Sequence, residues 1–576
     1  MRKGIGILAV VVLYRHLPDE STAWKTLRQA AAKRPAALSR FEVILYDNSP
    51  SGAVPSNLPA YATYHADKEN NGLSGAYNYG LDRAEADGFE WLLTIDQDTE
   101  LPPNCFERLC EYGCAISSRD DIGAIVPQLS EGKILLSPQR VLVGRSRAVP
   151  RGFTGIRQGE IHAFNSGALW RVQAIRQVGG FSKYFPLDHL DIWMHHQLYL
   201  AGFSVFIAGD LQLQHSLSLL DYKTRVSNER YRGFLAAEAA FCDLCKGPLE
   251  RGLLTARMCC RLIAQQIRGE RREIRKLTMR AIFNRIVVPR KDRIHRWIAE
   301  LPGGQPSCGA SVACRQRISV CMAAFNGESH IAAQLCSILD QLSPNDEVII
   351  VDDASTDRTR EEIRNLGDAR IRLIEHRETR GILQTFEDAI RAARNEILFL
   401  SDQDDIWLPG KVATVLSVFA DDPEVRLITS NVKLIDSSGE PLDERDVPQS
   451  RPFRGGFWAT LMRNQYRGCT MAFRVTIRRD ILPLPKHYDV MHDIWIATRN
   501  RLSHGKSIHI VEPLMLYRRH STTVTGRKRL SSFRRLRARL SLLIALGEFS
   551  IRRIGNARWI NPTVAGHEGG PVRQDT

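Results

Sequence analysis

The feature that most constrains the fold of this chain is a short apolar stretch that occurs twice and ends each time in Asp-Gln-Asp. The first copy ends in Asp96 and Asp98, and the second ends 306 residues later in Asp402 and Asp404. Apolar runs of this length and composition indicate buried strands, and residues two apart on a strand point to the same side. Each pair of carboxylates can therefore bind one hard divalent cation, such as Mg²⁺ or Mn²⁺.

Other polar landmarks recur at nearly the same distance along the chain. The pairs are Asp47 and Asp352, 305 residues apart, Asp191 and Asp493, 302 apart, and His215 and His520, 305 apart. Landmarks that share one offset indicate a large internal duplication. A chain of 576 residues is too long for a single core, so we predict two similar modules plus connecting material.

Strands and helices alternate within each module, which predicts an α/β fold with a Rossmann-like, doubly wound and mostly parallel sheet. The elements expected in the first module cover residues 4–13, 22–33, 41–46, 70–86 and 91–95. Those expected in the second cover residues 318–323, 331–342, 347–351, 358–365, 371–374, 382–393 and 397–400. Ligands of such sheets bind at the carboxyl ends of the strands, where both aspartate pairs stand.

Four segments are predicted along the chain. They are a first module over 1–220, a basic helical segment with a linker over 221–315, a second module over 316–526, and a basic helix with a disordered tail over 527–576. The tail is expected to be disordered because it is rich in glycine and polar residues and has few apolar side chains to bury.

The net charge of +15 is concentrated in two of these segments, because residues 251–296 carry +11 and residues 527–553 carry +8, which leaves −4 for the rest. Neither segment interleaves aromatic residues with its arginines or contains a recognised binding motif, so nucleic acid is not an expected partner. The basic helices are either solvated faces or contacts to an anionic membrane surface. We favour peripheral attachment to the inner face of the cytoplasmic membrane.

A cytoplasmic location is also favoured by the cysteines and the N-terminus. The twelve cysteines show no disulfide or zinc-site framework, and Cys242 and Cys245 form a lone C-x-x-C, so reduced thiols are predicted. The apolar run that ends at Leu13 lacks a small-residue cleavage site and is predicted to be a strand, not a signal peptide. No apolar run reaches the ~18 residues that a membrane span needs.

Motifs in both modules resemble family 2 glycosyltransferases, which have the GT-A fold. The first module is similar to bacterial rhamnosyltransferases in Leu45–Ser49, Asn71–Asn78 and Ile95–Asp98. The second resembles another rhamnosyltransferase-type branch in Ile318–Gly327, Val351–Asp357, Ser401–Asp405 and Tyr517–His520. The resemblance covers residues 4–225 and 316–526, so it implies two tandem GT-A domains.

The resemblance also implies how each module binds a nucleotide sugar. Asp98 and Asp404, with Asp96 and Asp402 beside them, would hold a divalent cation that bridges the donor diphosphate and neutralises the departing nucleotide. His215 and His520 would complete the shell of that cation or touch the diphosphate. The chain contains no complete G-x-x-x-x-G-K-S/T phosphate loop, which agrees with phosphate binding through a metal.

Residues that follow the first strands of each sheet would contact the nucleotide sugar. The candidates are Tyr14, Arg15, Asp47, Asn48, Asn71 and Gly72 in the first module and Phe325, Asp352, Asp353 and Arg380 in the second. Asp47 and Asp352 would read the nucleobase. The alternative is that these two aspartates only cap a turn or a helix start.

The general base should be a carboxylate on the acceptor side. Asp191 and Asp493 lie 93 and 89 residues after the last aspartate of their metal motifs, and Asp188 is a rival in the first module. Such a base takes the proton of the acceptor hydroxyl while the oxygen attacks the anomeric carbon, with inversion. A helix N-cap is the other role considered for Asp191 and Asp493, and His492 stands where the family commonly has an acid. Acceptor-side candidates are Asn165, Ser166, Gly167, Trp193, Gly468, Cys469 and Trp495.

Together these features predict a bifunctional, metal-dependent, inverting glycosyltransferase. It would transfer sugars, with L-rhamnose from dTDP-rhamnose as the favoured donor, to a lipid-linked or lipopolysaccharide glycan such as O-antigen in bacterial surface polysaccharide synthesis. One alternative keeps the fold but uses UDP-galactose or UDP-glucose. Another is a glycan-binding or scaffold protein in which one module is inactive.

Overall fold

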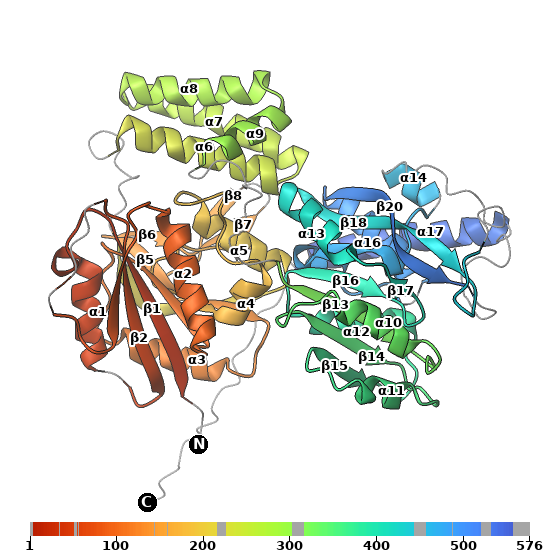
Figure 1. Ribbon diagram of the computed structural model, residues 1–576. Coiled ribbons are helices and arrows are strands. Elements are labelled where there is room, and N and C mark those ends of the chain that lie inside the picture. Colours follow the sequence, from red (N-terminus) through yellow and green to blue (C-terminus); the bar gives the residue numbers. More distant parts are fainter. Residues whose placement is uncertain are drawn as a thin grey trace, which may run out of the picture.

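The computed structural model describes residues 4–33, 35–50, 55, 57–142, 145–157, 159–215, 226–301, 316–442, 457–462, 464–486, 488–519 and 532–556. His520, the linker expected before residue 316 and the C-terminal tail lie outside the described residues. Figure 1 shows two α/β modules side by side, with a group of helices packed on the first.

The first module is built on a sheet with strand order β3-β2-β1-β4-β11-β5-β12-β9, and β6 pairs with β5. Strands β1 to β4 run parallel, whereas β11 is antiparallel to both of its neighbours. A separate small sheet has the order β10-β7-β8. The bounds are β1 (Ile5–Leu13), β2 (Leu38–Asp47), β3 (Ala62–Ala66), β4 (Trp91–Asp96), β5 (Ile122–Glu131), β6 (Ile134–Ser137), β7 (Gln139–Leu142), β8 (Arg145–Ala148), β9 (Gly155–Arg157), β10 (Ile161–His162), β11 (Ala168–Arg171) and β12 (Ser204–Gln214).

Helices cover both faces of this sheet, because alternate residues of its central strand are apolar on both sides. Leu8 and Val10 of β1 face a cluster that includes α2, α4 and α5, while Ile7 and Ala9 face α1 and α3. This continuous apolar pattern is typical of a parallel strand buried on both faces. The helices are α1 (Thr22–Ala32), α2 (Gly72–Ala86), α3 (Cys105–Ala115), α4 (Val172–Gln177) and α5 (Leu190–Leu200).

The second module repeats this architecture, with the strand order β15-β14-β13-β16-β19-β18-β20-β17. Its strands are β13 (Ile318–Ala324), β14 (Glu347–Asp352), β15 (Ile371–Glu375), β16 (Ile397–Ser401), β17 (Ile406–Trp407), β18 (Val425–Ile435), β19 (Ala472–Arg474) and β20 (Lys506–Arg518). Its helices are α10 (Ile331–Leu339), α11 (Thr359–Asn365), α12 (Ile382–Ala392), α13 (Lys411–Asp421), α14 (Phe457–Met462), α15 (Arg478–Ile481), α16 (His492–Leu502) and α17 (Ser532–Asn556), with short 3-10 turns at Pro18–Glu20 in the first module and at Gly468–Thr470 and Val475–Ile477 in the second.

The two sheets share one topology over seven successive strands. The parallel strands β3-β2-β1-β4 correspond to β15-β14-β13-β16, and an antiparallel strand, β11 or β19, follows in both. The predicted fold class, α/β with two mostly parallel sheets, is therefore confirmed. Strand β3 was not predicted, because residues 62–66 are short and only partly apolar.

The segment between the modules forms four helices, as its periodic apolar residues predict. These are α6 (Asn228–Cys245), α7 (Pro248–Ile267), α8 (Arg272–Val287) and α9 (Arg290–Ala299). Asp243 on α6 is buried and forms ion pairs with Arg285 and Arg293. The group rests on the first module, where Phe241 packs against Phe185 at a ring distance of 6.1 Å.

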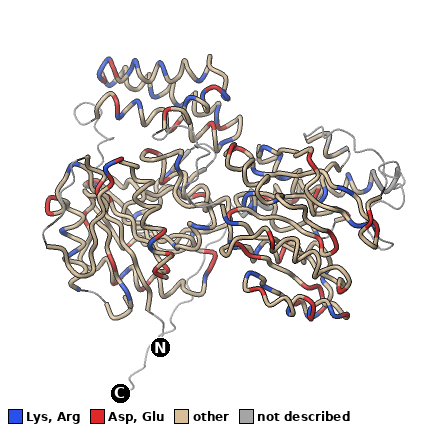
Figure 2. The backbone as a smooth tube through the Cα atoms, in the orientation of Figure 1, with Lys and Arg blue, Asp and Glu red and all other residues tan. Residues whose placement is uncertain are grey.

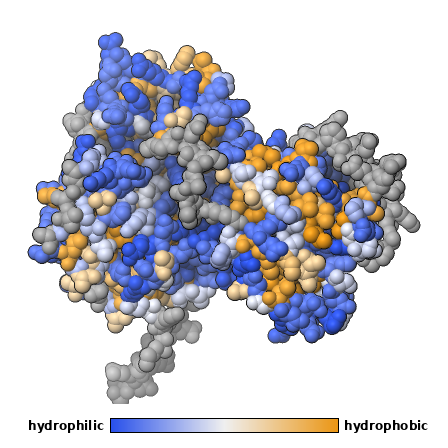
Figure 3. All heavy atoms as spheres, viewed as in Figure 1, coloured by the Kyte–Doolittle hydropathy of each residue, from blue (hydrophilic) through white to orange (hydrophobic). Residues whose placement is uncertain are grey.

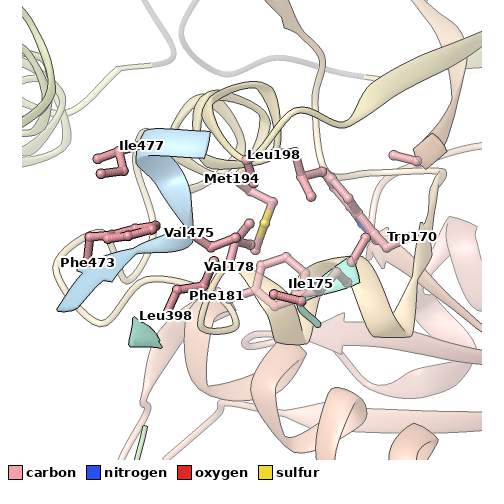
Figure 4. Packing of buried hydrophobic residues seen from close by; sticks show 14 of the residues in the cluster. Trp170, Ile175, Val178, Phe181, Met194, Leu198, Leu398, Phe473, Val475 and Ile477 are labelled. Atoms are coloured by element: carbon pink, nitrogen blue, oxygen red, sulfur yellow. The ribbon is translucent and has the colours of Figure 1, made fainter. Parts of the chain in front are cut away.

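The two modules also pack directly on each other through one continuous hydrophobic cluster. Figure 4 shows Val178 and Phe181 of the first module beside Phe473 and Val475 of the second. Polar contacts cross the same boundary: Gln177 Nε2 donates to the Ala393 carbonyl at 2.6 Å, and Arg317 binds both carboxylate oxygens of Glu85, at 2.5 and 2.8 Å. Because the two modules share this core, functional tests should use the full chain.

Replacing Phe473 with alanine should destabilise the full chain. The side chain is 0% exposed at the junction, and such a truncation costs about 3–5 kcal/mol. Chemical denaturation should show this loss. The matched control is Val511→Ala, because Val511 is 76% exposed and should change the free energy of unfolding by less than about 0.5 kcal/mol. An equally small effect of Phe473→Ala would show that the junction contributes little to the free energy of unfolding.

The described cysteines are all free thiols, as predicted. None of the described helices combines the length and the apolar character that crossing a membrane requires.

Candidate active sites

In both modules a glutamine between the two aspartates ties the end of one strand to the loop that follows its neighbour. Gln97 follows β4, and its side-chain oxygen accepts a hydrogen bond from the Tyr14 backbone N–H at 2.8 Å. Gln403 follows β16; it accepts from the Phe325 N–H at 2.7 Å and donates to the Phe325 carbonyl at 2.8 Å. The loops that carry Tyr14 and Phe325 are thereby fixed beside the aspartate pairs.

The first aspartate pair lies next to His215. The Asp98 carboxylate is 3.4 Å from Nδ1 of His215, and the Thr99 hydroxyl lies 2.9 Å from the same nitrogen. The Tyr77 hydroxyl donates to Asp96 at 2.9 Å. Burial raises the pKa of Asp96, while the nearby His215 lowers it and the charge of Asp98 raises it. Asp98 and His215 are thus neighbours, and Asp96 lies within electrostatic reach of both. Carboxylate oxygens and one imidazole are ligands that suit Mg²⁺ or Mn²⁺.

The second aspartate pair is also crowded with carboxylates. Burial, together with the charges of Asp404 and Asp493, raises the pKa of Asp402 to about 7. Carboxylates in one site repel each other when ionised, and a divalent cation would remove that cost. His520, the expected third ligand, lies outside the described residues. The described donors of the second site that fit a cation are Asp402 and Asp404.

Two buried residues, Asp405 and Cys469, lie beside Asp402. The three residues offer ligand atoms that lie within 4.8 Å of one another. Asp405 is 1% exposed and accepts a hydrogen bond from the Arg518 N–H at 3.0 Å. Burial raises the pKa of both Asp405 and Cys469 well above their ordinary values, which favours the neutral form of each. Both side chains belong to the core beneath the aspartate pair. Cys469 was predicted to lie on the acceptor side, but it is only 2% exposed.

Each candidate base acts electrostatically on its own aspartate pair. Burial raises the pKa of Asp191 to about 7, and the charges of Asp188 and Asp96 contribute to this rise. Asp493 is likewise among the charges that raise the pKa of Asp402. Asp493 accepts hydrogen bonds from the Ile494 N–H at 2.6 Å and from Asn464 Nδ2 at 2.8 Å. In both modules the predicted base therefore lies within electrostatic reach of the aspartate pair.

The alternatives considered for these aspartates are less well supported. Asp188 is ion-paired with Arg230 of α6, which engages its carboxylate. Asp191 and Asp493 lie inside the first turns of α5 and α16, whose N-cap residues are His189 and Met491. The N-cap alternative is therefore wrong.

Transfer by the first module should fall as the pH drops below about 7. A general base must be ionised to accept a proton, and burial raises the pKa of Asp191 to about 7, so its ionised fraction declines about tenfold for each further unit of acidification. The measurement is the pH profile of kcat/KM for the first transfer in the Asp404→Ala background. A rate that stays level down to about pH 5 would exclude a base with this pKa.

The first-module residues predicted to bind the nucleotide line the ends of β1 and β2. Asp47 is 2% exposed, and its two oxygens accept from the Ser49 N–H at 2.8 Å and from the Tyr64 hydroxyl at 2.7 Å. Asn48 is buried, and its Oδ1 has no hydrogen-bond partner among the described residues. Tyr14 is 38% exposed. A turn-forming role is thus visible for Asp47, and it does not exclude base recognition.

Three further first-module candidates are held in place by hydrogen bonds or by close packing. The Arg15 N–H donates to the Ser49 hydroxyl at 2.6 Å. Asn71 donates through its backbone and side chain to Asp67 at 2.9 and 3.0 Å. Gly72 has φ +71°, and a Cβ there would lie 2.6 Å from the Pro186 carbonyl oxygen, so only glycine fits at this helix start.

The second module uses the same positions with different partners. Asp352 is fully buried and accepts from the Ser355 N–H at 3.0 Å and from Arg360 Nε at 2.6 Å. Asp353 accepts from His376 Nδ1 at 2.8 Å and from the Arg380 N–H at 2.7 Å. Phe325, the counterpart of Tyr14, is 46% exposed. An exposed aromatic ring therefore stands beside the aspartate pair in both modules.

Of the predicted acceptor-side residues, those at positions 165–167 lie beside the first aspartate pair, whereas the two tryptophans are partly or fully buried. The Ser166 Oγ accepts a hydrogen bond from the Asp96 N–H at 2.9 Å. Asn165 adjoins Ser166, and the Gly167 N–H donates to the Thr94 carbonyl at 2.7 Å. Trp193 is partly buried. Trp495 is 1% exposed and donates to the Ile481 carbonyl at 2.7 Å. The prediction for Trp495 is wrong, because its ring belongs to the core.

Gly468 allows a close approach to the residue before the second candidate base. A Cβ at Gly468 would lie 2.1 Å from Nε2 of His492. His492 is 4% exposed and neither ring nitrogen has a hydrogen-bond partner among the described residues. Burial lowers its pKa, so a neutral ring occupies the position where an acid is common.

Several supporting residues were not foreseen from the sequence. Gln97 and Gln403 join the loops, Tyr77 orients Asp96, and Asp67 holds the start of α2. The two glutamines carried a signal, because each stands in the middle of the repeated Asp-Gln-Asp. Tyr77 lies within the Asn71–Asn78 motif, but nothing in the local sequence marks Asp67.

Comparison with known proteins decides the family. The profile described as glycosyl transferase family 2 matches two regions of the chain, residues 9–154 and 319–520. This chain belongs to glycosyl transferase family 2. Both matched regions of this family 2 chain contain an aspartate pair, so the duplication inferred from the sequence is confirmed.

Curated relatives of this glycosyl transferase family 2 chain match it over limited lengths. A protein of Escherichia coli named UDP-Glc:alpha-D-GlcNAc-diphosphoundecaprenol beta-1,3-glucosyltransferase WfgD is 31% identical over 101 residues, which is 18% of this chain and 40% of the relative. The putative teichuronic acid biosynthesis glycosyltransferase TuaG of Bacillus subtilis is 30% identical over 129 residues, 22% of this chain and 51% of the relative. The matched stretches thus span about half or less of these relatives.

Among solved structures, Staphylococcus aureus TarS 1-349 in complex with UDP-GlcNAc is similar with a TM-score of 0.32 and 17% identity, covering 42% of this chain and 74% of that one. The mannosyltransferase PcManGT of Pyrobaculum calidifontis, in complex with GDP-Man and Mn²⁺, has a TM-score of 0.30 and 24% identity, covering 42% and 65%.

Proposed function

We propose that this chain is a bifunctional, inverting glycosyltransferase whose two modules each transfer a sugar from a nucleotide sugar to a growing bacterial surface glycan. The observation that carries the proposal is the same in both modules. A carboxylate on the first turn of a helix, Asp191 or Asp493, interacts with the strand-end aspartate, Asp96 or Asp402. A pair of aspartates that can bind a cation and a nearby general base are the groups that sugar transfer from a nucleoside diphosphate needs.

The residues of each site divide this chemistry. Asp96, Asp98 and His215 would hold the cation in the first module, and Asp402 and Asp404 in the second. A bound Mg²⁺ or Mn²⁺ would neutralise the charge that develops on the diphosphate. Burial raises the pKa of Asp191 to about 7, which suits a group that accepts the proton of an acceptor hydroxyl near neutral pH.

The nucleobase would bind at the ends of β1 and β2, or of β13 and β14. Tyr14 and Phe325 are exposed aromatic rings at corresponding loops, and an aromatic ring can stack on a base. Asp47 and Asp352 would then meet the base edge. We propose dTDP-rhamnose as the donor. The alternative is a UDP-hexose, which the name of the Escherichia coli relative supports.

A lipid-linked glycan is the proposed acceptor, because the name of the same relative specifies a diphosphoundecaprenol acceptor. A protein that acts on such a lipid benefits from contact with the membrane surface, here the inner face of the cytoplasmic membrane. The helices α7 and α8 offer a surface for this. Met279, Phe283 and Ile286 on α8 are 55%, 61% and 70% exposed, at the spacing of one helical face.

Basic residues surround this apolar face. Figure 2 shows Lys and Arg gathered on the helices above the first module, and Figure 3 shows apolar side chains among the hydrophilic ones there. An apolar stripe flanked by arginines is typical of helices that lie in an anionic lipid surface.

Substituting Phe283 and Ile286 together by aspartate should weaken binding to vesicles that contain phosphatidylglycerol by about tenfold or more, because apolar burial is lost and negative charge is added. Vesicle co-sedimentation of the full chain measures this. The control is Val511→Asp, at a residue that is 76% exposed on β20. If both variants bound the vesicles equally well, α8 would not be part of the membrane contact.

A donor panel on the full chain tests the proposed function. The variants Asp98→Ala and Asp404→Ala leave one module intact each, and dTDP-rhamnose, UDP-glucose and UDP-galactose would be supplied with Mn²⁺ or Mg²⁺. Metal-dependent hydrolysis or transfer by both single-site variants supports two active modules. Glycan binding without turnover in either variant would instead identify a scaffold.

A further inference from the structure

A cavity of about 740 Å³ lies where the two modules meet, away from the aspartate pairs. Its first-module wall is formed by the loops around Asp120, Gly202 and Phe203 and by α4. Its second-module wall is formed by the end of α12, by β15 and by α15. Figure 1 shows α4 at the boundary between the modules. The volume falls in the range of sites for small organic ligands.

The position of these loops separates the cavity from the proposed sugar-transfer sites. Asp121 and Phe203 directly precede β5 and β12, and Arg394 lies shortly before β16. They therefore stand at the amino ends of parallel strands, whereas Asp96 ends β4 and Asp402 follows β16 at their carboxyl ends. The five residues of β16 alone span about 16 Å, so a ligand in the cavity does not reach the second aspartate pair.

The cavity is strongly basic on its second-module side. Five arginines line that side, namely Arg372, Arg391, Arg394, Arg478 and Arg479, and Arg171 lines the first-module side, against two lining acids, Asp120 and Asp121. Asp121 is already ion-paired with Arg119. Burial lowers the pKa of Arg478 to about 10, with the charge of Arg391 contributing, and burial together with the charge of Arg394 lowers the pKa of Arg372. These guanidinium groups therefore destabilise one another in the absence of an anion.

Three of the five arginines lack an acidic partner within the described part of the chain. Arg478 Nη2 donates to the Ala393 carbonyl at 2.7 Å, and Arg479 Nη1 to the Tyr199 carbonyl at 3.5 Å. Arg394 is exposed. Each guanidinium has five N–H donors, so these contacts leave donors for a ligand. The planar fork of arginine suits the bidentate recognition of phosphate oxygens.

We propose that this cavity is a second, non-catalytic binding site for a phosphate-bearing anion, of the size of a nucleoside diphosphate. The arginines would bind the phosphates, and Phe203, Ile374 and Leu482 among the lining residues offer apolar surface for the rest of the ligand. Because both modules contribute walls, the ligand would stabilise their junction. The inference is independent of the proposed sugar transfer, since it uses neither aspartate pair nor a divalent cation.

The test uses the full chain with Asp98→Ala and Asp404→Ala and with EDTA present, so that the sugar-nucleotide sites do not contribute. Inorganic diphosphate and dTDP are titrated separately by calorimetry at fixed salt. We expect saturable binding of about one ligand per chain and a rise in the thermal midpoint. Tighter binding of dTDP would assign a role to the nucleoside, and equal binding would assign recognition to the phosphates alone.

The deciding variant is Arg394→Glu, which should weaken binding about tenfold or more by reversing an exposed charge at the cavity. The matched control is Arg268→Glu, because Arg268 is an exposed arginine at the end of α7 and should leave binding unchanged. If Arg394→Glu loses its folded circular dichroism signal, Arg394→Gln replaces it, with a smaller expected loss. No saturable binding, or equal affinity in the Arg394 and Arg268 variants, would overturn the proposal.

Discussion

Replacing Asp404 with alanine should reduce transfer by the second module about 1000-fold or more, because the cation that stabilises the leaving diphosphate would lose a ligand. Transfer by the first module should continue. The glycan that carries only the first module's sugar should then accumulate, and mass spectrometry of the glycan products measures it directly. Asp404 is well suited to this test because it is partly exposed and belongs to no core cluster.

Two controls make this result specific. Asp98→Ala should give the mirror-image loss in the first module, since Asp98 lies 3.4 Å from His215 in the corresponding site. Asp421→Ala changes an exposed carboxylate at the end of α13 and should leave both transfers intact. Loss of both transfers in Asp404→Ala would show that the two sites are not independent, for example because they are coupled through the shared core.

Replacing Asp191 with asparagine should lower kcat of the first transfer by about 100- to 10,000-fold, the usual contribution of a general base. Asparagine keeps the shape of the side chain and can still accept the hydrogen bond that the Ile192 N–H donates at 2.8 Å, but it does not accept a proton. The KM for the donor should change little, because Asp191 is proposed to contact the acceptor. Initial-rate kinetics in the Asp404→Ala background measures both constants.

The rival residue provides the comparison. Asp188 is ion-paired with Arg230, so Asp188→Asn should affect stability more than kcat. If Asp188→Asn lowers kcat as far as Asp191→Asn while the thermal midpoint is unchanged, Asp188 is the base and the assignment of Asp191 fails.

The fold could be predicted from the sequence because its determinants are local and occur twice. The apolar runs that become β1, β4, β13 and β16 are continuous, and helical periodicity separates them, so the parallel sheets followed. Strand β3 (Ala62–Ala66) was missed because its exposed half carries polar residues. The duplicated Asp-Gln-Asp marked both aspartate pairs, and in each module the charges of the candidate base and of its pair interact.

What the sequence did not predict depends on contacts between distant segments. An apolar pattern shows that a residue is buried but not against what, so the junction at Phe473 was not foreseen. For the same reason Trp495 was assigned to the acceptor side although it packs in the core. The arginines of the inter-module cavity are likewise scattered between residues 372 and 479, and only the folded chain brings them together.

The most direct test of the account is to count the Mn²⁺ ions that the full chain binds tightly in the presence of a nucleoside diphosphate, by electron paramagnetic resonance. We predict about two ions per chain for the wild type, about one for either Asp98→Ala or Asp404→Ala, and none for the double variant. A wild-type chain that binds no Mn²⁺, or single-site variants that still bind two, would contradict two cation sites built on the duplicated aspartates.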